Sequence, residues 1–238
     1  MAVVYADSGT VSDVAGDVSL APTASATVNS GDVLLCVIGH NNNATQVTAT
    51  YTPPSGWTLA NSVTQANTRE FVYQKDTVDG TEDGDTFTWT VSGGAAAASH
   101  NAFIHRFTGG TGSLKAFNSS IGTSTTPADA GVTTTVDGDL AINFEIQATQ
   151  VLGAEFSGET GGNWTLVHSY GTGPPRMMLH TAPIATVATI DGGSTTIASS
   201  SAWVSIGYAL AVAAAAAGHP AVKRVGGVQF MARNKGVW

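Results

Sequence analysis

Hydrophobic and polar residues alternate along several stretches of the chain, as in β-strands with one buried face. Residues 86–91 (TFTWTV) alternate strictly and place Phe87, Trp89 and Val91 on one face. Residues 140–147 (LAINFEIQ) have apolar side chains at every second position. Asp-Gly turn sequences separate such stretches, and none carries a convincing helical period. The pattern predicts an all-β, antiparallel protein.

A sequence repeat divides the chain into two related halves. Three landmarks recur 107 residues apart: residues 31–39 (GDVLLCVIG) and 138–146 (GDLAINFEI), Trp57 and Trp164, and Arg69 and Arg176. Each half, about 20–108 and 128–212, holds too few strands to cover its own apolar face. Face-to-face packing predicts one jelly-roll-like β-sandwich over residues 1–217, followed by an extended C-terminal arm, residues 218–238. Two separate small sandwiches are the alternative.

The two halves differ on the strand face opposite the predicted core. Leu34, Cys36 and Ile38 in the first half correspond to Ala141, Asn143 and Glu145 in the second. The second face is therefore expected to meet solvent, whereas the first needs a cover. Either the N-terminal strand, residues 2–6, or another subunit would supply it. The second possibility makes Leu34 and Ile38 candidate contact residues in a homo-oligomer.

Charge is distributed unevenly along the 238 residues. Residues 1–217 carry five Lys and Arg against seventeen Asp and Glu, a net charge of −12, whereas the arm carries four basic residues and no acid, +4. So acidic a body disfavours binding to nucleic acid or to an anionic membrane. The arm also holds apolar side chains, so its candidate partner-binding residues are Lys223, Arg224, Val228, Phe230, Met231, Arg233, Lys235 and Trp238. A disordered chain end is the ordinary alternative.

Cysteine content and the N-terminal sequence bear on where the protein is made. Cys36 is the single cysteine, so no intrachain disulfide is expected. The first residues lack the basic start and apolar stretch of a signal peptide. Residues 203–217 are too short and too alanine-rich to span a bilayer. We expect synthesis in a reducing cytoplasm and no membrane partner.

Candidate chemistry in the sequence is sparse. Five acids crowd residues 76–85 (DTVDGTEDGD), and Asp79, Glu82, Asp83 and Asp85 form a weak calcium candidate. Their spacing is not that of an EF-hand, so a solvated acidic turn is the preferred interpretation. Glu70 is expected on an outer strand face, and no two carboxylates stand out as a catalytic pair. Metal-ligand spacing is missing among the six histidines, and His105 is expected to be a core aromatic residue. We predict no enzymatic activity and no cofactor.

Four tryptophans in the body raise the question of carbohydrate binding. Trp57, Trp89, Trp164 and Trp203 could stack on sugar rings if they were exposed. Trp57 and Trp164 occupy equivalent places in the repeat, which favours a packing role. Glycan binding is therefore kept as the alternative.

The order of motifs resembles that of a known group of proteins. The matching residues are Gly31-Asp32, residues 54–59 (PSGWTL), Arg69 to Tyr73, and Asp79 to Glu82. Together these motifs resemble those of uncharacterised β-sandwich structural proteins of tailed bacteriophages. The resemblance covers residues 20–212 and implies a virion component, assembled in the host cytoplasm. Its motifs belong to the scaffold and identify no catalytic group.

These observations lead to one functional hypothesis and one rival. The first is a non-enzymatic virion structural protein: a capsid decoration, minor head or head–tail-associated subunit. Its arm would bind major capsid, head–tail or tail subunits through acidic surfaces and apolar pockets. The rival is a tail-associated glycan- or receptor-binding β-sandwich module, which needs exposed tryptophans and a groove. Contact of the arm with packaged DNA is a weaker third possibility, because it has only four charges.

Overall fold

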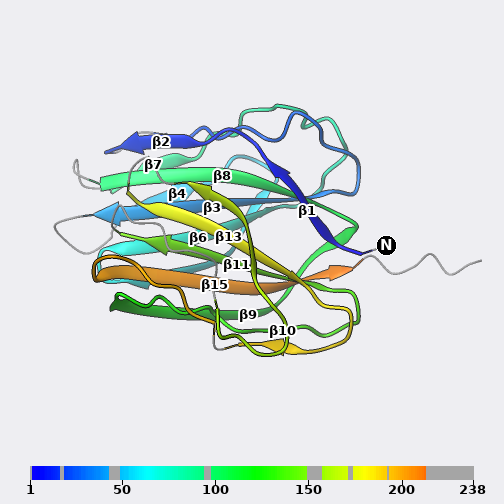
Figure 1. Ribbon diagram of the computed structural model, residues 1–238. Coiled ribbons are helices and arrows are strands. Elements are labelled where there is room, and N and C mark those ends of the chain that lie inside the picture. Colours follow the sequence, from blue (N-terminus) through cyan, green and yellow to red (C-terminus); the bar gives the residue numbers. More distant parts are fainter. Residues whose placement is uncertain are drawn as a thin grey trace, which may run out of the picture.

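The computed structural model describes residues 2–16, 19–42, 49–93, 98–148, 157–170, 174–191 and 193–212. These residues form antiparallel strands and contain no helix (Figure 1). The prediction of an all-β protein is confirmed, and the arrangement of the sheets is that of a β-sandwich.

Two large sheets make up the sandwich. The first has the strand order β1 (Val4–Ser8), β8 (Ala98–Thr108), β3 (Val33–Asn42), β6 (Thr68–Lys75), β5 (Trp57–Gln65), and β2 (Ser12–Ala15) also pairs with β8. The second has the order β12 (Thr165–Tyr170), β13 (Arg176–Pro183), β11 (Leu140–Gln147), β15 (Ser201–Val212), β9 (Gly110–Ser124). Two short ribbons accompany them: β4 (Thr50–Thr52) with β7 (Thr90–Ser92), and β10 (Val132–Thr133) with β14 (Thr189–Ile190).

Each large sheet is built from one continuous half of the chain. All strands of the first sheet end by Thr108, and all strands of the second begin at Gly110 or later. In a jelly roll, successive strands alternate between the two sheets. The strand order therefore does not confirm the jelly-roll part of the prediction.

The core lies between the facing sheets. Alternate side chains of β3 (Val33, Leu35 and Val37) pack in one cluster with alternate side chains of β11 (Leu140, Ile142, Phe144 and Ile146). The period-two pattern thus places apolar residues where each sheet meets the other. Full burial of such a side chain stabilises the fold by roughly 1.5–3 kcal/mol.

At one end of the sandwich the sheets are joined by polar contacts as well. Gly39 of β3 lets them approach, because a Cβ there would lie 3.0 Å from both Ile146 Cδ1 and Pro175 Cγ. Nearby, Asn41 Nδ2 donates to the Ala148 carbonyl at 2.8 Å and Asn101 Nδ2 to the Pro175 carbonyl at 2.6 Å. These amides fix the relative position of the sheets by direct bonds between them.

The outer face of the first sheet is covered by the chain's own loops. Leu34, Cys36 and Ile38 are fully buried in a second apolar cluster, whose covering side chains include Leu20 and Trp89. The expectation of a cover by the N-terminal strand or by another subunit is wrong: β1 and β2 pair with the edge of β8. Leu34 and Ile38 expose no surface in this structure, so they offer a partner no contact area here.

The outer face of the second sheet is buried too, which corrects the expectation that it meets solvent. Ala141 packs with Val132 and Trp164 in a small third cluster. Asn143 and Glu145 are fully buried but hydrogen-bonded: Ser205 Oγ donates to Asn143 Oδ1 at 2.8 Å, and Gln147 Nε2 donates to Glu145 Oε1 at 2.5 Å. Their polarity indicated solvent, yet both are buried with one internal hydrogen bond each, while Asn143 Nδ2 and Glu145 Oε2 have no partner among the described residues.

Candidate functional site

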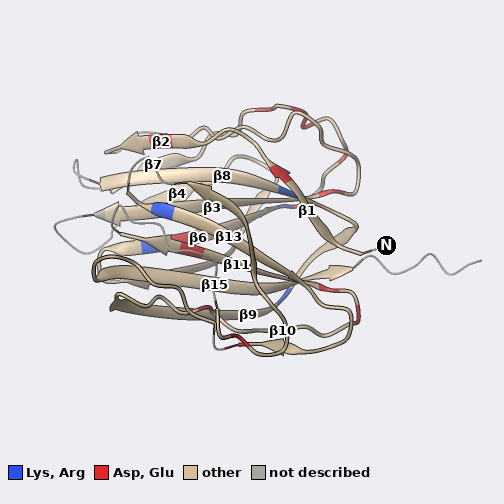
Figure 2. Ribbon diagram, in the orientation of Figure 1, with Lys and Arg blue, Asp and Glu red and all other residues tan. Residues whose placement is uncertain are grey.

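Acidic residues gather at the end of the sandwich where β3 begins and β15 ends. We call this the acidic end; it is defined by Asp32, Asp76, Asp79, Glu82, Asp83, Asp85, Asp137 and Asp139. Figure 2 shows acidic positions concentrated at the end of the molecule that carries the N-terminus. Lys75 and Arg106 form ion pairs with Glu82 and Asp32 of this end.

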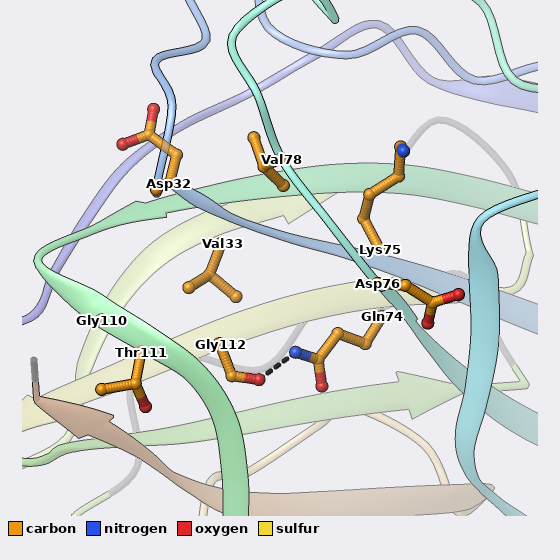
Figure 3. Close-up of a pocket in the computed structure, with 10 residues that line it drawn as sticks. Asp32, Val33, Gln74, Lys75, Asp76, Val78, Gly110, Thr111 and Gly112 are labelled. Carbon is orange, nitrogen blue, oxygen red and sulfur yellow. Dashed lines mark hydrogen bonds between the residues drawn. The ribbon is translucent and has the colours of Figure 1, made fainter.

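A polar pocket of about 220 Å³ lies at the acidic end, lined by residues that include Asp32, Gln74, Lys75, Asp76 and Gly112 (Figure 3). Several of its polar groups are bonded within the protein. Gln74 Nε2 donates to the Gly112 carbonyl, and Lys75 Nζ lies 3.5 Å from Glu82 Oε1. Asp76 Oδ1 accepts a hydrogen bond from Thr58 Oγ1 at 2.7 Å. The pocket is therefore a polar junction of strands and loops.

Arg106 joins three segments at this end. Its Nε and Nη2 donate to the two carboxylate oxygens of Asp7 at 3.1 and 2.8 Å, and its Nη1 donates to Asp32 Oδ2 at 3.0 Å. Burial raises the pKa of Asp7, but the hydrogen bonds from Arg106 and Ser25 outweigh it, and the net pKa is lowered. The guanidinium thus ties β1 and the start of β3 to β8 through charge-assisted bonds.

The carboxylates of the acidic loop, residues 76–85, bind different partners within the protein. Asp79 Oδ1 accepts hydrogen bonds from the N–H and hydroxyl of Thr81, which lower its pKa. Glu82 is buried beside Lys75 and accepts the Gly80 N–H at 3.1 Å, while Asp83 accepts the Val28 N–H. Asp85 is exposed. Among the described residues, no group of three or more His, Cys, Asp or Glu side chains is placed to hold a metal ion.

The other predicted site residues lie elsewhere. Leu34 and Ile38 are in the core, as described above. All eight candidate residues of the C-terminal arm fall within 213–238, outside the described residues.

The predicted aromatic residues of the body are buried. Trp57, Trp89, Trp164 and Trp203 are at most 5% exposed. His105 is also a core residue, as expected: its ring lies 6.0 Å from that of Phe103 and 5.6 Å from that of Phe144.

Sequence reasoning missed a buried cluster on the outer side of the first sheet. His40 Nδ1 lies 2.8 Å from Tyr51 Oη and 3.0 Å from His100 Nδ1, and Tyr51 Oη lies 2.5 Å from His100 Nδ1. Burial lowers the pKa of His40 to about 3, and the neighbouring His100 and Arg69 add to the shift. The three residues are far apart in sequence, and only the pairing of β3 with β8 unites the two histidines.

A second missed feature is Glu70 of β6, which lies on the inner face of its strand and is fully buried. The expectation of an outer position is wrong, because Arg69 takes the outer face. Neither carboxylate oxygen of Glu70 has a hydrogen-bond partner among the described residues. Burial, with Glu145 nearby, raises the pKa of Glu70 well above its usual range. Burial also raises the pKa of Glu145 to about 8.

No helix among the described residues has the length and apolar character needed to cross a membrane.

Comparisons with protein-family models, with curated proteins and with solved structures found no match for this chain.

Proposed function

We propose that this chain is a non-enzymatic structural protein of a bacteriophage virion, a capsid decoration, minor head or head–tail-associated subunit, anchored through its C-terminal arm. The phage setting comes from the sequence resemblance over residues 20–212. Its partners would be major capsid, head–tail or tail subunits, and it would act in the virion as a homo-oligomer.

One observation carries the proposal: the body covers its own apolar sheet faces, whereas the arm combines basic and large apolar residues outside the repeat. The outer faces of both sheets are covered by side chains of the body itself. The arm is outside the repeat and holds four of the nine basic residues together with Val228, Phe230, Met231 and Trp238. Basic and large apolar side chains are the types that anchor protein interfaces.

Deletion of residues 219–238 tests this role. The shortened chain should remain folded by circular dichroism but be lost from phage particles, as measured by quantitative mass spectrometry of purified virions. A matched variant keeps the arm and replaces Lys223, Arg224, Arg233 and Lys235 by Gln, and it should reduce occupancy without changing arm length. Full occupancy by the shortened, folded chain would overturn the proposal.

The rival glycan-binding function has less support. It needs aromatic platforms at the surface, and the four tryptophans of the body are buried. A glycan array with the intact protein separates the two functions. Saturable sugar binding would favour the glycan-binding function over the structural one.

We also propose that the two sheets are copies of one ancestral unit, in line with the sequence repeat. The strands β8–β3–β6–β5 follow the same order as β15–β11–β13–β12. β3 and β11 begin 107 residues apart, at Val33 and Leu140. Superposition of the two sheets should match their strands at this offset; a better match at another offset would argue against duplication.

A further inference from the structure

An apolar pocket opens beside the acidic end. It has a volume of about 340 Å³ and is lined by Ala2, Val3, Gly138, Pro183, Ile184 and Ala185. This size is at the lower end of the range of cavities that hold small ligands or side-chain groups, about 300–1,000 Å³. Its lining differs from that of the polar pocket, because it offers no charged side chain.

Exposed apolar side chains belong to the same segments as this pocket. Val4 is 49% exposed, Val136 45% and Val187 53%, and each is within two residues of a pocket-lining position. The Val187 N–H donates to Asp137 Oδ1 at 2.8 Å, so a carboxylate lies beside the apolar surface. The combination is an apolar depression with negative charge at its rim.

The chain leaves the second sheet beside this pocket. At the end of β15, the Val212 N–H donates to Asp139 Oδ1 at 3.1 Å. A Cβ on the pocket residue Gly138 would lie 3.9 Å from both γ-carbons of Val212. The sequence continues for 26 residues beyond this point. Ten of them, fully extended, span about 33 Å, so the arm is long enough to fold back onto the pocket and its acidic rim.

We infer that residues 219–238 bind the apolar pocket and the acidic end of their own sandwich. Phe230, Met231 or Val228 would fill the pocket, and the four basic side chains would lie among the exposed carboxylates of the acidic end, such as Asp85 and Asp137. A tether that starts at the pocket gives the arm a millimolar effective concentration, which a second copy in dilute solution lacks. The contact does not depend on the virion role; if that role holds, the arm is stored on the body until a partner displaces it.

Zero-length carbodiimide cross-linking of the full chain tests this contact. An equal mixture of unlabelled and ¹⁵N-labelled protein is treated at low salt and digested, and linked peptides are identified by mass spectrometry. We expect links from Lys223 and Lys235 to Asp137 and to the loop 76–85, with both peptides carrying the same isotope. The Lys75–Glu82 pair, 3.5 Å apart, is the internal positive control.

Two outcomes would overturn the inference. Links with mixed isotopes would assign the pocket to a neighbouring copy. No links from the arm to the acidic end, while Lys75 still links to Glu82, would show that the arm does not bind there.

A pair of matched variants tests the apolar part. Ala185→Lys places a cation at the exposed rim of the pocket and should lower the yield of arm links at least about fivefold. Ile121→Lys makes a similar change on β9, where Ile121 is 48% exposed, and should leave the yield unchanged. Equal yields in the two variants would contradict a role for the pocket. The Lys75–Glu82 link in each sample reports whether the acidic end remains folded.

Discussion

At the scale of single residues, Glu70 has unfavourable surroundings for a charged group. Its carboxyl group is buried between the sheets, both oxygens lack partners among the described residues, and its pKa is raised well above the usual range. A buried ionised carboxylate without a partner is costly, so the surroundings of Glu70 favour its protonated form.

Replacing Glu70 by Gln should therefore change how stability depends on pH. In the folded protein the Glu70 carboxyl group keeps a proton that it loses in the unfolded chain above about pH 4.5. The free energy of unfolding therefore falls by roughly 1.4 kcal/mol per pH unit, until the pH reaches the pKa of the folded state. We expect E70Q to match the parent protein at pH 5 and to exceed it by at least about 1.4 kcal/mol at pH 8 in urea denaturation. The exposed Asp85→Asn serves as the control and should show no such gain; an equal pH response in E70Q and its parent would contradict a protonated Glu70.

The His40–Tyr51–His100 cluster gives a second residue-scale prediction. Tyr51→Phe removes a hydroxyl that lies within hydrogen-bond distance of both imidazoles and leaves buried polar nitrogens behind. We expect a loss of about 1–3 kcal/mol in the free energy of unfolding. Tyr73→Phe removes one hydrogen bond, to the Tyr51 carbonyl at 3.0 Å, and should cost about 1 kcal/mol. If Y51F cost no more than Y73F in urea denaturation, the cluster would add nothing to stability.

At the scale of elements, the same repeat position serves two environments. Trp57 packs edge-on against Phe87 and Trp89, and its indole N–H has no partner among the described residues. Trp164 instead donates from Nε1 to Asp129 Oδ2 at 2.6 Å. Burial raises the pKa of Asp129, and this bond opposes the rise.

The two tryptophans should therefore respond differently to Phe. Trp57→Phe loses packing only, whereas Trp164→Phe also leaves a buried carboxylate without its indole donor. We expect W164F to be less stable than W57F by about 1–3 kcal/mol at pH 7. Urea denaturation of both variants measures the difference, and equal losses would mean that the Trp164–Asp129 bond contributes nothing net.

Strands such as β11 were predictable because period-two alternation is a local property of the sequence. Residues 86–91 alternate as strictly, yet a strand begins only at Thr90, because Thr86 and Trp89 form isolated bridges to Thr23 and Leu20. The apolar Leu34, Cys36 and Ile38 indicated that a cover was needed, but nothing local pointed to Leu20 and Trp89 as its source. Asn143 and Glu145 were misplaced because their partners, Ser205 and Gln147, become visible only through strand pairing or side-chain geometry. The His40–Tyr51–His100 cluster could not be predicted for the same reason. The candidate role of the arm was inferred from its composition alone.

At the scale of the whole molecule, buried histidines and carboxyl groups together set the pH of greatest stability. Burial lowers the pKa of His40 to about 3 and of His180 to about 4, and it also lowers the pKa values of His105 and His168. Below about pH 6.5 the unfolded chain binds protons at these four sites that the folded protein excludes, so acid destabilises the fold.

We therefore expect stability to pass through a maximum between about pH 5 and 8. On the acid side of this maximum, the four histidines lower stability by more than Glu70, Glu145 and Asp129 raise it. On the alkaline side, the carboxyl groups with raised pKa values lower stability, Glu145 until about pH 8. Differential scanning calorimetry between pH 5 and 9 should show the melting temperature falling on both sides. A melting temperature that rises steadily to pH 9 would contradict the raised carboxyl pKa values.

The confinement of each sheet to one half of the chain has a consequence for synthesis on the ribosome. The first sheet can form once Thr108 has emerged, with its outer face already covered. Its inner face, with Leu35 and Val37, packs against the second sheet. That sheet is complete only when the ribosome has made β15, which lies between β9 and β11 and ends at Val212. At about 5–20 residues per second this interval lasts roughly 5–20 s. During translation the nascent chain therefore presents one apolar sheet face, which is the time at which it is most exposed to aggregation and most in need of a chaperone.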